Sequence, residues 1–212
     1  MNAGEEGADL VAFTGHKGML GPQGTGGLWV REGLDIEPLM RGGTGGDSRR
    51  REMPSAMPDR LEAGSVNAPG LAGLDAGIRY VMDRGPEAIH AHEAGLKARL
   101  RSGLEDIPGV RVLSPAAPDG VGIVTLNVEG IDAGTLAHRL EKEWAVQGRA
   151  GLHCAPECHA LLGSAEGGAL RFSVGWASTP EDVDKALEGV EGIAGRVSRG
   201  PVNHQEATKG GT

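Results

Sequence analysis

The sequence predicts an α+β domain that follows the end of an α/β domain. Between about residues 85 and 197, helical apolar patterns alternate with apolar runs of strand length, as in domains that pack helices on a sheet. Before that region, two apolar runs flank a glycine-rich turn. We expect residues 1–84 and 85–197 to form two structural parts and residues 198–212, which are polar and turn-rich, to form a disordered tail.

The composition argues against several classes of protein. The chain has 212 residues, enough to bury a core, and its formal net charge of -8 disfavours a nucleic-acid partner. No apolar stretch approaches the length of a transmembrane helix, and the first residues lack the pattern of a signal peptide. With only 2 cysteines there is no disulfide framework. We therefore expect a cytoplasmic protein with no membrane partner.

The first part opens on two expected strands. Leu10–Phe13 is expected to be a buried strand and Gly27–Val30 a second strand. Only about nine residues precede the first of them, too few to cover both faces of a strand in a parallel sheet, so we expect further protein upstream. Residues 41–51 are expected to form a loop. The apolar face of the helix expected after it consists of Leu71, Leu74, Ile78 and Val81.

The second part alternates helices and strands. Pro86 suits the first position of a helix, and Asp132 and Thr179 suit the N-cap position of two later helices. Both cysteines are expected in a loop. The expected elements, in order, are a helix from Pro86, strands at 110–113 and 121–128, a helix after Asp132, a strand at 169–176 and a helix after Thr179.

The turn after the first strand presents a lysine. Gly15, Gly18 and Gly21 let the backbone come close to a ligand, and Thr14 and His16 offer donors that suit a phosphate. Lys17 is the residue that this turn presents. On composition alone, a lysine in such a turn is more often a solvated surface residue.

The full string favours the functional interpretation. Phe-Thr-Gly-His-Lys-Gly, followed by Gly-Pro-Gln-Gly-Thr-Gly-Gly-Leu, resembles the lysine loop of class V pyridoxal-phosphate enzymes, in the cysteine desulfurase and selenocysteine lyase branch. The resemblance implies that Lys17 forms a Schiff base with pyridoxal 5'-phosphate, whose phosphate Thr14 and His16 contact. It also implies an α/β fold, that of fold-type I transferases. The chain then corresponds to the C-terminal portion: the end of the large cofactor-binding domain and the small α+β domain.

A second string places a cysteine between basic residues. Arg149 and His153 flank Cys154, and a positive neighbourhood favours the reactive thiolate, although a lone cysteine is more often a small apolar residue. Arg-x-Gly-x-His-Cys-Ala-Pro is similar to the catalytic cysteine loop of the desulfurases. By that resemblance, Cys154 takes the sulfur of bound cysteine as a persulfide.

A metal site is the alternative at these cysteines. His153, Cys154, Cys158 and His159 are four potential ligands within seven residues. The two adjacent His and Cys pairs are poorly spaced around one tetrahedral ion, and no second cluster of ligands exists to complete a structural site. We therefore expect no metal.

Two further strings add expected binding residues. In Arg-Phe-Ser-x-Gly, Arg171 points away from the apolar face of its strand and is either a surface residue or an anion ligand. The resemblance implies that it holds the substrate carboxylate, beside Arg149 and His153. The loop Gly-Gly-Thr-Gly around Thr44 resembles the family's loop that contacts the cofactor of a neighbouring subunit, which implies a homodimer. Residues 60–67 resemble another family segment, to which we assign no role.

The resemblance thus predicts a cysteine desulfurase that converts L-cysteine to L-alanine, with Lys17 as base and Cys154 as sulfur acceptor. Its partners would be a small amino acid and a sulfur-acceptor protein. The family's residues at the pyridine nitrogen and phenolic oxygen match nothing here, so we expect an N-terminally truncated chain. Two alternatives stay open: a class V aminotransferase or selenocysteine lyase, and a non-catalytic fragment lacking half the cofactor site.

Overall fold

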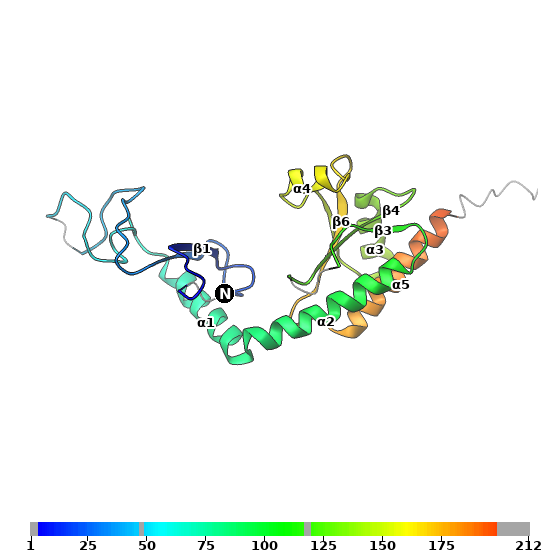
Figure 1. Ribbon diagram of the computed structural model, residues 1–212, viewed down its shortest axis with the longest axis horizontal. Coiled ribbons are helices and arrows are strands. Elements are labelled where there is room, and N and C mark those ends of the chain that lie inside the picture. The colour runs from blue at the N-terminus through cyan, green and yellow to red at the C-terminus, as the bar shows by residue number, and fades with distance from the viewer. Residues whose placement is uncertain (1–3, 47–48, 117–119, 199–212) are drawn as a thin grey trace, which may run out of the picture. The chain divides into compact units, whose positions relative to one another are not determined.

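A computed structural model describes residues 4–46, 49–116 and 120–198 of the chain (Figure 1). It divides into two compact units, Met1–Pro86 and Glu87–Thr212, which are considered separately below. Apart from Ser198, the segment expected to form a disordered tail lies outside the described residues.

The first unit opens with a two-stranded antiparallel sheet. Strand β1 (Leu10–Thr14) pairs with β2 (Gly26–Val30), with Leu10 opposite Val30 and Thr14 opposite Gly26. Both expected strands are confirmed, but the expectation that the first is buried is wrong. Leu10 is 47% exposed, because the sheet has only these two strands within the described part of the chain.

Helix α1 (Ala68–Arg84) packs against the turn that joins these strands. Asn67 begins it, since its side chain accepts a hydrogen bond from the amide of Gly70 at 3.1 Å. Leu74 is the buried member of the expected apolar face, whereas Leu71 is 42% exposed. A side chain on Gly77 would meet the carbonyl oxygen of Met19 at 2.4 Å. The absence of a Cβ there lets α1 lie directly against the turn.

The second unit is built on a four-stranded antiparallel sheet. Its strand order is β3-β4-β6-β5, which places the last two strands out of sequence order. The strands are β3 (Val110–Val112), β4 (Ile123–Val128), β5 (Arg149–Gly151) and β6 (Ala169–Ser173). The helices are α2 (Pro86–Glu105), α3 (Ala133–Trp144), α4 (Pro156–Leu161) and α5 (Pro180–Ser198).

The core of this unit lies between one face of the sheet and the helices α2, α3 and α5 (Figure 1). Leu126 and Leu170 are fully buried on the sheet side. Arg99 of α2 forms two hydrogen bonds of 2.7 and 2.8 Å with Asp184, which ties α2 to α5. The principal helical core residues are Leu96, Leu100, Leu104, Leu136, Leu140, Val183, Val190 and Ile193.

Local signals fix the helix ends as expected. Asp132 caps α3 by accepting a hydrogen bond from the amide of Thr135 at 2.9 Å. Thr179 caps α5, since its hydroxyl oxygen accepts from the amide of Asp182 at 3.2 Å while its own amide donates to the Asp182 carboxylate at 2.9 Å. The expectation of both cysteines in a loop is wrong for Cys158, which lies in α4. Proline at the start of α4 and an acidic first turn favour that helix.

Among the described residues, no helix combines the length and apolar character that crossing a bilayer requires.

Candidate active site

Lys17 lies exposed at the centre of the turn that joins β1 to β2. The turn is held by backbone hydrogen bonds from Gly15 to Thr25 at 2.9 Å and from Gly21 to Gly15 at 2.8 Å. Side chains on either glycine would collide with Leu74 of α1, at 2.9 and 2.7 Å. These two glycines therefore serve packing on α1, whereas the sequence suggested an approach to ligand.

The donors expected to serve a phosphate accompany this lysine. Thr14 ends β1 and His16 directly precedes Lys17, and all three side chains are exposed. Within the described part of the chain, no hydrogen bond or ion pair ties down the Lys17 amine. A free amine beside a hydroxyl and an imidazole fits the aldehyde and phosphate of pyridoxal phosphate.

Thr44 lies on a separate loop of the first unit. The loop borders a cavity of about 320 Å³ that also receives Arg50, Glu52 and Asp59. Lys17 does not line this cavity. The structure thus brings Thr14, His16 and Lys17 together where β1 enters the turn but places Thr44 at a separate cavity.

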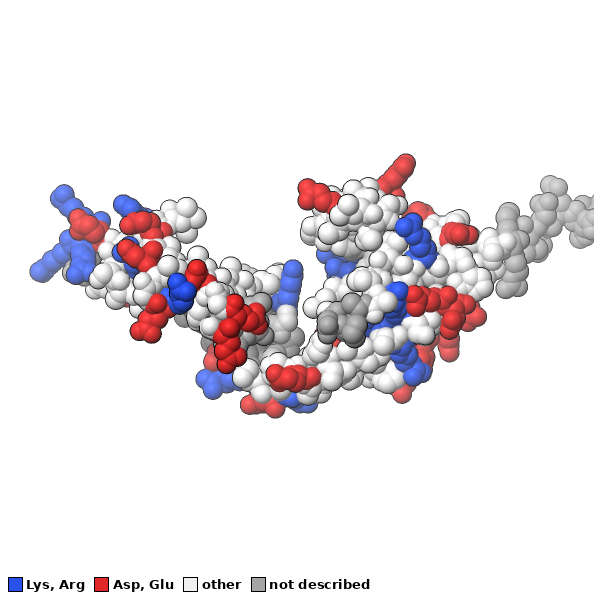
Figure 2. All heavy atoms as spheres, in the orientation of Figure 1, with Lys and Arg blue, Asp and Glu red and all other residues white. Residues whose placement is uncertain are grey.

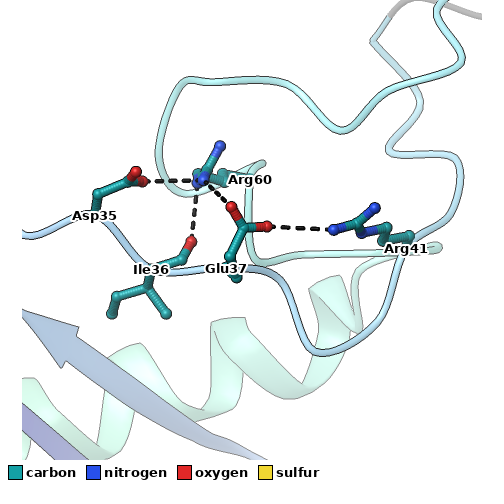
Figure 3. Close-up of polar contacts among 5 residues, drawn as sticks. All are labelled: Asp35, Ile36, Glu37, Arg41 and Arg60. Atoms are coloured by element: carbon teal, nitrogen blue, oxygen red, sulfur yellow. Dashed lines mark hydrogen bonds and ion pairs between the residues drawn. The ribbon is translucent and has the colours of Figure 1, made fainter.

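Arg60 fixes the path of the chain into the Thr44 loop (Figure 3). Its guanidinium donates to the carbonyl of Ile36 at 3.0 Å and to the carboxylate of Asp35 at 2.9 Å. Glu37 lies 3.7 Å from the same group and pairs with Arg41 at 3.2 Å. The amide of Gly64 donates to the carbonyl of Gly43 at 2.8 Å, which closes the connection on the loop itself. Arg60 is a structural residue that sequence reasoning left without a role.

In the second unit, the sheet register brings two arginines together. Arg149 of β5 lies opposite Arg171 of β6, and Arg171 lies opposite Thr125 of β4. Cross-strand partners point to the same face, and here it is the face turned away from the buried Leu126 and Leu170. The expected orientation of Arg171 is confirmed.

Arg171 retains unused hydrogen-bonding capacity. Its side chain is half-buried, and Nε is buried without a hydrogen-bond partner. A buried donor without a partner is destabilising, and an anion in front of it removes that cost. The arrangement of Arg149 and Arg171 therefore suits a carboxylate.

Cys154 lies on the loop that follows β5. Its thiol is exposed and free, as is that of Cys158. The Arg149 guanidinium lies 4.0 Å from Cys154 Sγ. His153 and Cys154 both adopt left-handed backbone conformations, with φ of 54° and 60°. Such conformations cost about 1–2 kcal/mol for each residue with a side chain, so other contacts must hold this loop.

His153 is held on both sides of its ring. Its Nε2 lies 2.8 Å from the carbonyl oxygen of Arg149, and its Nδ1 lies 3.1 Å from Nε2 of His159. Burial lowers the pKa of His153 below its usual range, and the charges of Arg171 and Arg149 act in the same direction. His153 is therefore less readily protonated than a free imidazole, and the Arg149 guanidinium is the permanently basic group that the structure places beside the Cys154 thiol.

Residues beyond the sequence-predicted set surround this loop. His159 is buried, at 4% exposure, as is Ser164, at 2%. The sequence suggests His159 only as a potential metal ligand, and no group of three or more metal-binding side chains occurs among the described residues. A histidine and a serine five positions apart carry no sequence signal of their own, because only the fold brings their side chains together.

Charged side chains of both signs lie interspersed on the face shown in Figure 2. Asp9 pairs with Arg31 at 2.7 Å and Asp75 with Arg79 at 2.8 Å, both on the surface. This mixed distribution fits the net charge of -8 and offers no broad basic surface in that view.

Comparison with known proteins places the chain in one family. The family Aminotransferase class-V matches residues 1–186. A probable cysteine desulfurase from Methanothermobacter thermautotrophicus is 34% identical over 195 residues, which is 89% of this chain and 48% of that protein. A probable cysteine desulfurase 2 from Mycobacterium leprae is 34% identical over 189 residues, covering 87% of this chain and 44% of that protein.

Solved structures show the same similarity. The apo cysteine desulfurase of Thermococcus onnurineus NA1 superposes with a TM-score of 0.81 at 31% identity, covering 91% of this chain and 48% of that one. The cysteine desulfurase CsdA (S-sulfonic acid) of Escherichia coli gives a TM-score of 0.76 at 26% identity over 90% of this chain and 47% of the other. The chain thus spans about half the length of the relatives it matches. Its fold is part of the fold-type I architecture, as expected.

Proposed function

The chain belongs to the Aminotransferase class-V family, and we propose that it is part of a pyridoxal-phosphate-dependent cysteine desulfurase. The reaction would convert L-cysteine to L-alanine and leave the sulfur on Cys154 as a persulfide. The observation that carries the proposal is the cysteine loop, in which an exposed thiol lies 4.0 Å from the Arg149 guanidinium. Sequence similarity to cysteine desulfurases supports it.

Lys17, Thr14 and His16 would hold the cofactor. Lys17 offers an amine without a partner among the described residues, and the other two offer donors for a phosphate. When bound, pyridoxal phosphate withdraws electrons from the amino acid attached to it, which makes the Cα proton acidic. The Lys17 amine would accept that proton and later return one.

Arg171 and Arg149 would bind and orient the amino acid. A carboxylate in front of Arg171 satisfies the buried Nε and neutralises the repulsion between the two guanidinium groups. Both ring nitrogens of His153 already have protein partners. We therefore assign His153 to positioning of the loop, whereas the sequence had suggested contact with substrate.

Cys154 would receive the sulfur atom. Its thiolate attacks Sγ of the substrate, so that a sulfur–sulfur bond forms as the substrate Cβ–Sγ bond breaks. The electron pair of the broken bond stays with the carbon skeleton, which takes up protons to become alanine. Exposure of the Cys154 loop suits transfer of the persulfide to an acceptor protein. A free thiol in this role suits a reducing, cytoplasmic location.

Thr44 would complete a cofactor site of a second copy of the chain. Its cavity lacks Lys17, which supports a role outside the Lys17 site of its own chain. Leu39 and Met40, which precede the loop, are 99% and 70% exposed. Large apolar side chains that are exposed at consecutive positions are typical of a surface that another subunit covers. A homodimer with shared sites therefore fits this unit.

The test adds pyridoxal phosphate to the purified chain and reduces the mixture with borohydride before peptide mass spectrometry. We expect the cofactor on Lys17, with a visible absorption band that Lys17→Ala abolishes and Lys142→Ala, at another exposed lysine, retains. Release of alanine from L-cysteine is then measured. Random labelling of lysines, or an equal band in Lys17→Ala, would refute the cofactor assignment.

The alternatives predict different outcomes. A plain class V aminotransferase would label at Lys17 but form no persulfide on Cys154. A selenocysteine lyase would release alanine from L-selenocysteine in preference to L-cysteine. A non-catalytic piece would show neither label nor product. The cysteine loop beside Arg149 favours desulfuration over plain transamination.

A further inference from the structure

Four groups form one continuous series of hydrogen bonds beside the Cys154 loop, which is called the relay below. Ser164 Oγ lies 2.8 Å from Nδ1 of His159, whose Nε2 lies 3.1 Å from Nδ1 of His153. Nε2 of His153 lies 2.8 Å from the carbonyl oxygen of Arg149. The two inner members, His159 and Ser164, are almost fully buried. The relay runs from the segment after α4, through α4, to strand β5.

The Arg149 carbonyl fixes the direction of every bond. A carbonyl oxygen only accepts, so Nε2 of His153 must carry the proton that it donates. Neutral His153 then has an acceptor at Nδ1, which requires His159 to donate from Nε2. His159 in turn has an acceptor at Nδ1, which requires the Ser164 hydroxyl to donate to this nitrogen at 2.8 Å in preference to the more distant carbonyl oxygen of His159 at 3.5 Å. One neutral tautomer of each histidine is compatible with all three contacts.

The relay is linked to the Cys154 thiol through Arg149, which takes part with both its main chain and its side chain. The main chain of Arg149 receives the last hydrogen bond, and its side chain lies 4.0 Å from Cys154 Sγ. His153 and Cys154, between them, hold two consecutive left-handed conformations that oppose the preference of residues with side chains. The ring of His153 is the part of this strained segment that is anchored to buried groups.

We propose that His159 and Ser164 are positioning residues, which hold the Cys154 loop beside Arg149 by fixing the tautomer and orientation of the His153 ring. Both side chains are almost fully buried, which suits support of the loop and not contact with a ligand. The proposal deepens the desulfurase assignment and rests on it for its biological meaning, because the thiol they position is the sulfur acceptor there. The relay itself can be measured without substrate or cofactor.

The charged and titratable groups around His153 are known. His159 lies against its Nδ1, and Arg149 and Arg171 lie on the sheet beside it. Both arginines stay charged throughout the accessible pH range.

The first measurement is the tautomeric state of both rings by long-range 15N–1H NMR of the full 212-residue chain. We expect His153 and His159 to carry their protons on Nε2 near neutral pH. Substitution of each histidine assigns its signals. A proton on Nδ1 of His159 in the neutral state would overturn the proposal, because no donor would then face His153.

The second measurement is the rate of alkylation of Cys154 by iodoacetamide, in a Cys158→Ser background that leaves a single thiol. We expect His159→Leu to slow alkylation by about three- to tenfold, as the loop loses its position beside Arg149. His159→Gln keeps a donor near the position of Nε2 and should retain most of the rate. Equal rates in all three proteins, or equal losses in both variants, would overturn the proposal.

Ser164→Ala tests the buried end of the relay. It also provides a second test of the proposal if the His159→Leu variant does not fold. Loss of the serine donor should shift the NMR signal of Nδ1 of His159 toward the protonated form, as its two tautomers become comparable. Ser102→Ala, at an exposed position of α2, is the matched control and should leave that signal unchanged. An unchanged signal in Ser164→Ala would overturn the assignment of Ser164.

The outcomes separate this proposal from the assigned reaction. Neither the NMR nor the alkylation experiment depends on catalysis, so a chain that binds no cofactor still tests the relay. If turnover is observed, we expect His159→Leu to lower kcat with little change in KM, because Arg171 is untouched. Cofactor on Lys17 together with normal alkylation of His159→Leu would refute the relay alone.

Discussion

Arg149 and Arg171 are direct cross-strand neighbours on β5 and β6, and both guanidinium groups project from the face of the sheet that carries no core. Like charges in opposite positions destabilise a sheet. The Arg171 Nε atom adds a buried donor without a partner. The pair is therefore a cost to the free chain that a bound carboxylate would remove.

The first prediction is that Arg171→Met stabilises the chain while it weakens substrate binding. Loss of the repulsion and of the unpaired donor should raise the free energy of unfolding by about 1 kcal/mol, as measured by urea denaturation. The KM for L-cysteine should rise by about two orders of magnitude, because a bidentate ion pair is lost. A destabilised variant with normal KM would contradict the assignment.

Arg111→Met is the matched control on the same sheet. Arg111 of β3 donates to the carbonyl of Leu162 at 2.9 Å, so its hydrogen-bonding capacity is used within the chain. We expect this substitution to lower the free energy of unfolding by about 0.5–1.5 kcal/mol and to leave KM unchanged.

The second prediction concerns the two thiols. Cys154→Ser should abolish formation of persulfide and release of alanine, since a hydroxyl beside Arg149 cannot accept the sulfur atom. Cys158→Ser should retain both, because Cys158 lies in α4 and has no assigned part in the reaction. Alanine and persulfide are quantified after incubation with L-cysteine and pyridoxal phosphate. Equal loss in both variants would refute the distinct role of Cys154.

The parts of the fold that local sequence encodes were predictable. Proline at the first position of α5 and the reciprocal bonds of Thr179 and Asp182 give that helix a start that the sequence alone reveals. Val124, Leu126 and Val128 alternate with less buried residues in β4, and this period of two in the sequence likewise indicates the side of the strand that faces the core. Lys17 and Cys154 were found because short strings of neighbouring residues carry the family resemblance.

The features that depend on contacts between distant segments were not predictable. The pairing of Arg149 with Arg171 depends on the register between the edge strand β5 and its neighbour β6. This register cannot be read from a single sequence. The side chains of His153, His159 and Ser164 meet only because α4 folds back on the cysteine loop. The exposure of β1 also reflects which chain segments pair with it, a property of tertiary structure.

The third prediction is that Gly77→Ala weakens cofactor binding at a distance. A methyl group there would meet the carbonyl oxygen of Met19 at 2.4 Å and that of Leu20 at 2.9 Å, and backbone cannot move aside cheaply. The turn that presents Lys17 must therefore shift from α1. We expect a loss of about tenfold or more in affinity for pyridoxal phosphate, measured by titration of its absorbance.

Gly95→Ala supplies the control for helix propensity. A side chain at this position of α2 would meet no atom within 4 Å. Replacement should therefore raise the free energy of unfolding by about 0.5–1 kcal/mol, the usual gain for alanine over glycine within a helix. Affinity for the cofactor should stay unchanged. Equal effects of both substitutions on cofactor affinity would show that contact between α1 and the turn is unimportant.

The fourth prediction is a loss of stability on acidification that originates at His153. Burial lowers the pKa of the folded imidazole below that of the unfolded chain, about 6.5. As pH falls through that value, the unfolded chain binds a proton that the folded chain does not, so the free energy of unfolding decreases until the folded ring is protonated too.

The variant His153→Asn tests this dependence, because asparagine tolerates the left-handed backbone and cannot titrate. The stability difference between wild type and this variant should therefore shrink or reverse between about pH 7.5 and pH 5.5 in denaturation experiments. A difference that stays constant, or that grows in acid, would mean that His153 is as easily protonated in the folded chain as in the unfolded one.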